Sequence, residues 1–126
     1  MRKESDGRVT RRRILVANEP RSYRETFARV FEALRPHVEA IAVDPDALDR
    51  EALRLRPDLV VCGRVTPTVV AVARCWMELR VEGERLVTTS KPRMPSDGRE
   101  VDLAYLLSFI DRSGEMSGRD RGDALL

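Results

Sequence analysis

Cysteine and histidine are scarce in this chain, which has two cysteines and one histidine among its 126 residues. Cys62 and Cys75 form no Cys-x-x-Cys pair, and His37 alone cannot complete a zinc site with them. If Cys62 ends one parallel strand and Cys75 begins the next, they lie at opposite ends of a sheet, more than about 10 Å apart. A disulfide requires a closer approach. We therefore expect two reduced packing residues and no metal site.

Long hydrophobic runs are also missing. No apolar stretch approaches the ~20 residues of a membrane span, and no hydrophobic segment follows the charged N-terminus as it would in a secretory signal. The expected location is the cytoplasm. A composition of 42% hydrophobic and 35% charged residues is typical of one globular domain with tails.

Excess positive charge is confined to one end of the chain. Residues 1–13 carry six basic and two acidic side chains, a balance of +4, so the remainder sums to −2 within the net charge of +2. We expect 1–11 to be a flexible basic arm. The Arg11-Arg12-Arg13 run could contact nucleic acid, but it lacks aromatic residues and helical periodicity, so a solvated tail is the favoured interpretation.

The usual catalytic motifs are absent. The sequence has no Ser/His/Asp set, no paired catalytic carboxylates, no Walker loop and no Gly-x-Gly-x-x-Gly motif. The loop after the first expected strand also lacks the hydroxyl- and glycine-rich cradle that binds flavin phosphates. The sequence therefore favours a protein that is not an enzyme and that carries no cofactor.

What the chain does contain is a regular alternation of strands and helices around the segment 56–63. Its run of Leu and Val, between Pro57-Asp58 and Gly63, is typical of a strand buried on both faces. Further strands are predicted at 12–17, 38–43, 75–81 and 85–89. Helices are predicted at 20–34, from Asp44 to the residue before Pro57, at 67–74 and at about 100–112. Residues 113–126, rich in glycine and charge, are expected to form a disordered tail.

This order predicts an α/β domain over 12–112 with a doubly wound, three-layer, flavodoxin-like sheet. Right-handed crossovers place the first strand between the second and third, in the order 2-1-3-4-5. Only Glu82-Gly83-Glu84 separates the last two strands, so they are expected to form an antiparallel hairpin.

At this point the chain resembles the receiver domain of bacterial response regulators, over residues 13–112. The segment 13–20 (Arg-Ile-Leu-Val-Ala-Asn-Glu-Pro) is similar to the first receiver strand and its acidic loop. Pro57 to Gly63, with Pro67 four residues beyond, is similar to the strand that ends in the phosphoacceptor. Lys91-Pro92 matches the family's Lys-Pro.

The departures from that pattern affect the phosphorylation site itself. The acidic pair that binds Mg²⁺ falls on Ala17 and Asn18, which leaves only Glu19 as an acid there. The phosphorylated aspartate falls on Gly63. The switch hydroxyl has no counterpart, and the helix between the fourth and fifth strands is missing. Acyl-phosphate formation needs a carboxylate nucleophile and a divalent cation. The resemblance therefore implies a pseudo-receiver in which Lys91 is the one residue left of the usual phosphorylation site.

Two functions follow as hypotheses. The first is a phosphorylation-independent pseudo-receiver that binds a protein partner, or a second copy of itself, through the hairpin and the final helix. The alternative is a sensor of a small anion or other ligand at the carboxyl ends of the strands. Its expected ligand-binding residues are Asn18, Glu19, Gly63, Arg64, Thr66 and Lys91. If there is no such site, Lys91 is expected to pair with Glu19.

Overall fold

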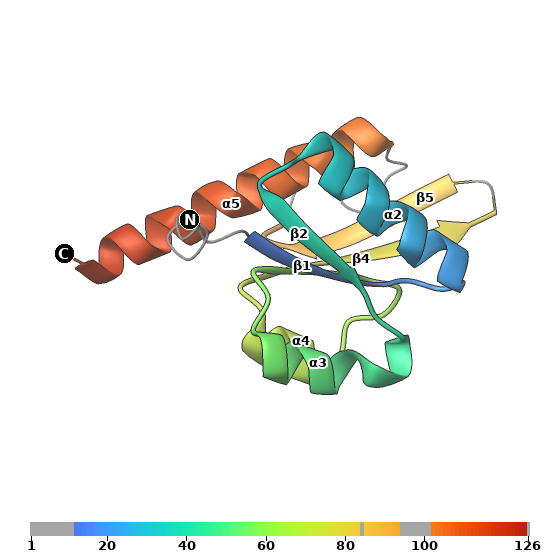
Figure 1. Ribbon diagram of the computed structural model, residues 1–126, viewed down its shortest axis with the longest axis horizontal. Coiled ribbons are helices and arrows are strands. Elements are labelled where there is room, and N and C mark those ends of the chain that lie inside the picture. Colours follow the sequence, from blue (N-terminus) through green and yellow to red (C-terminus); the bar gives the residue numbers. More distant parts are fainter. Residues whose placement is uncertain (1–11, 84, 94–101, 126) are drawn as a thin grey trace, which may run out of the picture.

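The computed structural model describes residues 12–83, 85–93 and 102–125. Within these ranges it contains one five-stranded sheet with helices on both faces (Figure 1). In chain order the elements are β1 (Arg12–Ala17), α2 (Arg21–Leu34), β2 (Val38–Ala42), a 3-10 turn η1 (Pro45–Ala47), α3 (Leu48–Leu55), β3 (Leu59–Cys62), α4 (Pro67–Val72), β4 (Cys75–Glu82), β5 (Arg85–Lys91) and α5 (Leu103–Leu125).

The sheet has the predicted order, β2-β1-β3-β4-β5. Strands β1 to β4 are parallel to their neighbours, and β5 returns antiparallel to β4. The predicted mixed α/β architecture and the antiparallel hairpin are therefore confirmed. The turn between the two strands includes Gly83 at a φ of +66°, a left-handed conformation that suits glycine.

The two faces of the sheet form two separate apolar cores. On one face Ile14, Val16, Leu59 and Val61 pack against α2 and α5. On the other face the alternate residues of the same strands, such as Leu15 and Val60, pack against α3 and α4. All of these strand residues are buried, which explains why β1 and β3 have no polar alternation.

The β4–β5 hairpin differs from the other strands because one of its faces is polar. Met77 and Leu79 of β4 belong to the core under α5, whereas Glu78, Arg80 and Glu82 alternate with them on the opposite side. The tight turn between β4 and β5 leaves no room for a crossover helix, and among the described hairpin residues on the same face as Glu78 only Trp76, nearer the start of β4, packs against the core that includes residues of α3 and α4. Alternation of apolar and polar residues is the usual pattern of an antiparallel pair with one solvated face.

The two cysteines occupy opposite faces of the sheet. Cys62 belongs to the core under α3 and α4, and Cys75 to the core under α2 and α5. Both are buried and neither forms a disulfide, as expected for packing residues.

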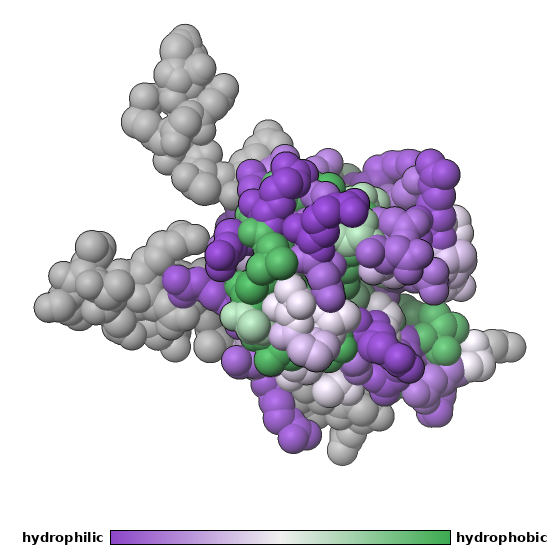
Figure 2. Space-filling view, turned by 90° about the horizontal axis from the view of Figure 1, so that it is seen from below, coloured by the Kyte–Doolittle hydropathy of each residue, from purple (hydrophilic) through white to green (hydrophobic). Residues whose placement is uncertain are grey.

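The surface over α3 and α4 mixes hydrophilic and apolar side chains (Figure 2). Leu53 of α3 and Val70 of α4 are exposed there, at 51% and 45%. Among the described residues, no helix has both the length and the apolar character needed to cross a membrane.

The end of the chain departs from the prediction. The final helix begins at Leu103 and continues to Leu125, where a helix ending at about 112 and a disordered tail over 113–126 were expected. The physical reason lies at Ser113, which is fully buried. Its hydroxyl accepts a hydrogen bond of 2.6 Å from Arg12 Nη2, so packing against the domain includes the first residue of the expected tail. The expected arm, 1–11, lies outside the described residues.

Arg12 and Arg13 take structural roles that their place in a basic run does not indicate. Besides Ser113, Arg12 donates through Nη1 to the carbonyl of Ile110 at 2.9 Å, which ties the start of β1 to α5. Arg13 donates to Glu39 and to the carbonyl of Leu55. Two of the three arginines in the run are therefore committed to the domain's own packing.

We expect the substitution Arg12→Ala to lower the free energy of unfolding by about 2 kcal/mol, because two charge-assisted hydrogen bonds to α5 are lost. Arg12→Lys keeps the charge but cannot span both acceptors, so it should fall between wild type and Arg12→Ala. Urea denaturation followed by circular dichroism measures the effect, with the exposed Arg29→Ala as control. Equal midpoints for Arg12→Ala and Arg29→Ala would contradict this role.

Candidate functional site

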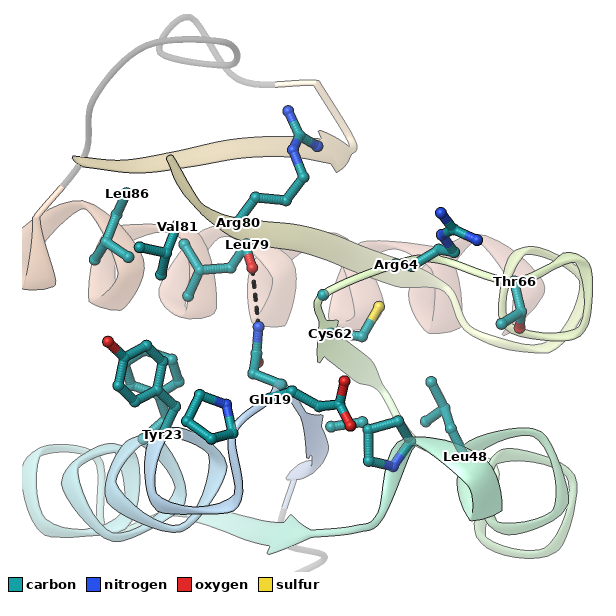
Figure 3. A pocket seen from close by; sticks show the side chains of 16 residues that line it. Glu19, Tyr23, Leu48, Cys62, Arg64, Thr66, Leu79, Arg80, Val81 and Leu86 are labelled. Carbon is teal, nitrogen blue, oxygen red and sulfur yellow. Dashed lines mark hydrogen bonds between the residues drawn. The ribbon is translucent and has the colours of Figure 1, made fainter. Parts of the chain in front are cut away.

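A hollow of the described structure lies at the carboxyl ends of the parallel strands (Figure 3). We call it the carboxyl-end hollow. Its volume is about 720 Å³, large enough for a small organic molecule. Its lining residues are Ala17, Asn18, Glu19, Pro20, Tyr23, Phe27, Pro45, Leu48, Cys62, Gly63, Arg64, Thr66, Leu79, Arg80, Val81 and Leu86.

The fold brings together five of the six residues expected at a ligand site. Asn18 and Glu19 follow β1, Gly63 and Arg64 follow β3, and Thr66 caps α4. All five line the carboxyl-end hollow. Parallel strands end at the same edge of a sheet, so the residues after them meet there.

The sixth residue, Lys91, is not part of this site, and its expected position was wrong. Lys91 is the last residue of β5 and pairs with Trp76, which in turn pairs with Val60 of β3. It therefore lies about 10 Å back along the sheet from Gly63, at roughly 3.3 Å per residue. The antiparallel direction of β5 carries its end to the amino ends of the other strands. Lys91 is exposed there and is equally remote from Glu19, so the alternative pairing is also wrong.

Asn18 forms the floor of the hollow and is 3% exposed. Its Nδ2 donates a hydrogen bond of 3.0 Å to the carbonyl of Leu79, drawn as the dashed line in Figure 3. Its Oδ1 is buried and has no hydrogen-bond partner among the described residues. A buried acceptor without a donor is unfavourable by about 1–3 kcal/mol, and because this oxygen is itself buried, a molecule in the hollow does not contact it in this structure.

The loop between β3 and α4 forms the polar wall, and its own contacts hold it in place. Thr66 accepts a hydrogen bond from the backbone N–H of Val69 and donates its hydroxyl proton to Asp49 at 2.6 Å. Glu78 accepts from the backbone N–H of Val65 at 2.9 Å. The Thr66 hydroxyl is therefore already used in capping α4 and in binding α3.

Gly63 leaves this part of the hollow open. A Cβ built on Gly63 would meet no other atom within 4 Å. A Cβ at this position therefore meets open space. This property makes Gly63 a suitable place to block the site.

The opposite wall is apolar and was not predicted as part of a site. Tyr23 and Phe27 of α2 face Leu79 and Val81 of β4 and Leu86 of β5; Figure 3 shows Tyr23 across from the three hairpin side chains. A second hollow of about 520 Å³ continues between α2 and the hairpin tip and shares Tyr23, Phe27, Val81 and Leu86. Tyr23 and Phe27, four residues apart, lie on one face of α2, and Tyr23 is 41% exposed.

Charges at the rim of the hollow are few and largely balanced. Arg80 donates to Glu78 at 2.9 Å and lies 3.5 Å from Glu82, and its guanidinium points away from the hollow in Figure 3. Within the described ranges, Glu19 and Arg64 form no ion pair. In the same ranges no group of three His, Cys, Asp or Glu residues could hold a metal ion.

Cys62 borders the hollow with a thiol that stays protonated. Burial raises its pKa to about 12, and the negative charge of Glu78 acts in the same direction. A reactive cysteine needs the thiolate, so Cys62 behaves as a small apolar wall residue, as its place in an apolar strand predicted.

The raised pKa of Cys62 predicts a loss of stability in alkali. In the unfolded chain the thiol ionises near its ordinary value of 9.0, whereas in the folded chain it stays neutral up to about 12. This contribution to stability is complete below pH 9 and is lost between pH 9 and 12, by up to about 1.4 kcal/mol per pH unit. Denaturation at several pH values should show a shallower decline for Cys62→Ala than for wild type. Parallel declines would contradict the prediction.

Comparisons with known proteins place the chain in no family. No protein-family model matches it, and neither does any curated protein or any solved structure. The resemblance to receiver domains therefore rests on the residues quoted above, and the function of the hollow has to follow from this chain's own side chains.

Proposed function

We propose that this chain is a pseudo-receiver, a regulatory domain of flavodoxin-like ancestry that binds a small molecule in the carboxyl-end hollow and catalyses no reaction. The observation that carries the proposal is a hollow of about 720 Å³ that five of the six residues expected at a ligand site line together. The hollow lies where open α/β sheets bind their ligands. A cytoplasmic location stays part of this proposal.

Loss of phosphotransfer supports the non-enzymatic part of the proposal. Gly63 offers no carboxylate for phosphorylation, and Ala17 and Asn18 offer none for Mg²⁺. Lys91 lies too far from the hollow to neutralise a phosphoryl group there. Without the nucleophile, the metal ligands and this lysine, the chain has no groups with which to form an acyl phosphate.

The arrangement of the hollow suits a regulatory role. Its walls come from α2, from the β3–α4 loop and from the β4–β5 hairpin. A ligand between them contacts three segments that are distant in sequence, so binding restrains α2 and the hairpin relative to each other. A ligand that binds one arrangement better than another shifts the population toward it.

A second candidate function is contact with a protein partner, the function first expected from the sequence. The observation that favours it is the apolar surface between α2 and the hairpin tip, where Tyr23 is 41% and Val81 47% exposed. This surface continues into the carboxyl-end hollow through Tyr23, so a bound ligand would alter it directly. The two functions are compatible, with the hollow as input and this surface as output.

The proposed function is tested by screening metabolites and fragments against the purified chain by ¹H–¹⁵N NMR. We expect saturable shifts at Asn18 and Gly63, and a gain of about 2.7 kcal/mol in stability at 100 times the dissociation constant. The variant Gly63→Phe should fold normally and lose these shifts, because its ring occupies the hollow. Thr89→Ala, on the exposed face of the hairpin, is the matched control. No binder, or binders unaffected by Gly63→Phe, would refute the proposal.

Restoring an aspartate tests the loss of phosphotransfer separately. The substitution Gly63→Asp meets no steric obstacle, yet we expect no phosphorylated product with acetyl phosphate and Mg²⁺, because the metal ligands and the lysine are still missing. Intact-mass spectrometry of the variant and of wild type provides the measurement. A phosphorylated aspartate in Gly63→Asp would show that the ancestral site still works.

A further inference from the structure

We infer that the amino ends of β3 and β4, together with the end of β5, form a basic surface that binds the phosphate backbone of duplex nucleic acid without reading its sequence. Four exposed cations carry this inference, and we call them the amino-edge cations: Arg56, Arg74, Lys91 and Arg93. The inference goes beyond the proposed function, because this edge is the end of the sheet opposite the carboxyl-end hollow.

The topology places these cations side by side. Arg56 lies in the loop that leads into β3, and Arg74 directly precedes β4. Because β5 is antiparallel, its last residue Lys91 pairs with Trp76 at the start of β4, and Arg93 follows two residues later. Strands β3, β4 and β5 are neighbours in the sheet. At about 4.8 Å from strand to strand, the row of cations spans about 10 Å.

Most of this positive charge is not used within the domain. The acid nearest to Arg56 in the chain is Asp58, whose carboxylate accepts a hydrogen bond of 2.9 Å from the backbone N–H of Arg13. Within the described ranges Arg56, Lys91 and Arg93 form no ion pair. These three side chains can therefore meet an external anion without giving up a contact inside the domain.

Arg56 also occupies a backbone position where arginine is unusual. It follows the end of α3 with φ +50° and ψ +62°, in the left-handed region. Glycine, or sometimes asparagine, is common at such a helix end, because a Cβ is strained there. Arg56 is exposed, and its side chain makes no hydrogen bond within the described ranges. Packing of the domain therefore does not explain the arginine, whereas a contact with a partner does.

The opposite end of the sheet has a different charge. The exposed acids that end or follow β1, β2 and β4 are Glu19, Asp44, Asp46 and Glu82. Arg64 and Arg85 lie at that end as well, so cations do not dominate it. A composition rich in arginine would by itself place cations at both ends. Their concentration at the amino end is therefore a property of the fold, and it fits a partner that carries many negative charges.

The chain that precedes β1 adds cations at the same edge. The backbone N–H of Arg12 donates to the carbonyl of His37, so β1 begins beside the loop that leads into β2. The basic residues that precede Arg12 are Arg2, Lys3, Arg8 and Arg11. Arg12 and Arg13 themselves are held by contacts within the domain, so the basic surface depends on loops that the N-terminal run did not indicate.

The chemistry of this edge favours a duplex over a single strand or a membrane. Guanidinium groups bind phosphate oxygens through pairs of N–H donors. A row of about 10 Å matches about three successive phosphates of one strand, which follow each other every ~3.4 Å along the duplex axis. Within the described residues 56–58, 73–74 and 92–93 no large hydrophobic side chain is exposed. These loops therefore offer no aromatic ring for unpaired bases and no apolar side chain for insertion into lipid.

Fluorescence anisotropy of a short labelled DNA duplex tests the surface in the full chain. We expect a dissociation constant of about 10⁻⁴ to 10⁻⁶ M near physiological salt, which is typical of binding without sequence preference. The logarithm of the affinity should fall with the logarithm of salt concentration at a slope of about −3 to −4, because four phosphate contacts each release about 0.9 of a counterion. Duplexes of unrelated sequence should bind alike, and a single strand should bind more weakly.

Two double variants separate the amino-edge cations from the general charge of the chain. Arg56→Gln with Lys91→Gln removes two of these cations, and Arg29→Gln with Arg50→Gln removes two exposed cations of α2 and α3. Net charge changes equally in both. Only the first should weaken duplex binding, by at least about tenfold near 0.1 M salt, and lower the salt slope by about two.

The single variant Arg56→Gly keeps the test independent of folding defects. Glycine relieves the left-handed backbone, so this variant should be at least as resistant to urea as wild type. It should nevertheless lower the salt slope by about one.

Four outcomes would overturn the inference. One is the absence of duplex binding at about 50 mM salt, where phosphate contacts are strong. The second is an equal loss of affinity in the two double variants. The third is a single strand that binds as tightly as the duplex. The last is binding to phosphatidylserine vesicles, lost in Arg56→Gln with Lys91→Gln, by a chain that does not bind the duplex, which would assign the edge to a membrane surface.

Discussion

The direction of β5 is the constraint on which most other features of this domain depend. Two strands joined by a tight turn at Gly83 can only pair antiparallel. That return brings Leu86 beside Val81 and so builds the apolar wall of the hollow. It also carries Lys91 to the far end of the sheet. A crossover helix in place of the turn would reverse all of these results.

The sequence predicted the sheet better than it predicted the site. An apolar run such as Ile14 to Ala17 predicts a strand buried on both faces, because side chains on both of its sides are apolar. This prediction needs only the residues of the strand itself. The position of Lys91 depends on the direction of a whole strand. Lys91 was expected at the carboxyl ends of the strands, although the short turn already indicated an antiparallel β5, and these two expectations were incompatible. The role of Arg12 was hidden for a related reason, since its partners lie about a hundred residues away along the chain.

Asn18 shows a different limit of sequence reasoning. The residue type and its place after β1 indicated a polar group at the site, and the structure places it there. Whether the amide is satisfied depends on where the carbonyl of Leu79 lies, 61 residues further along. That hydrogen bond fixes the orientation of a buried amide at a position that in receiver domains would hold a metal ligand. Local sequence therefore identified the position, and only the tertiary structure determined its chemistry.

The exposed edge of β5 has a consequence for self-association. An edge strand with free backbone groups can recruit strands from other molecules, and charged side chains or proline on the edge are common protection against this. Strand β5 begins with Arg85, ends with Lys91 and is followed by Pro92, and both charged residues are exposed. Strand β2, at the other edge, carries Glu39 opposite Arg13. Both borders of the sheet are thus guarded against intermolecular β-pairing and aggregation.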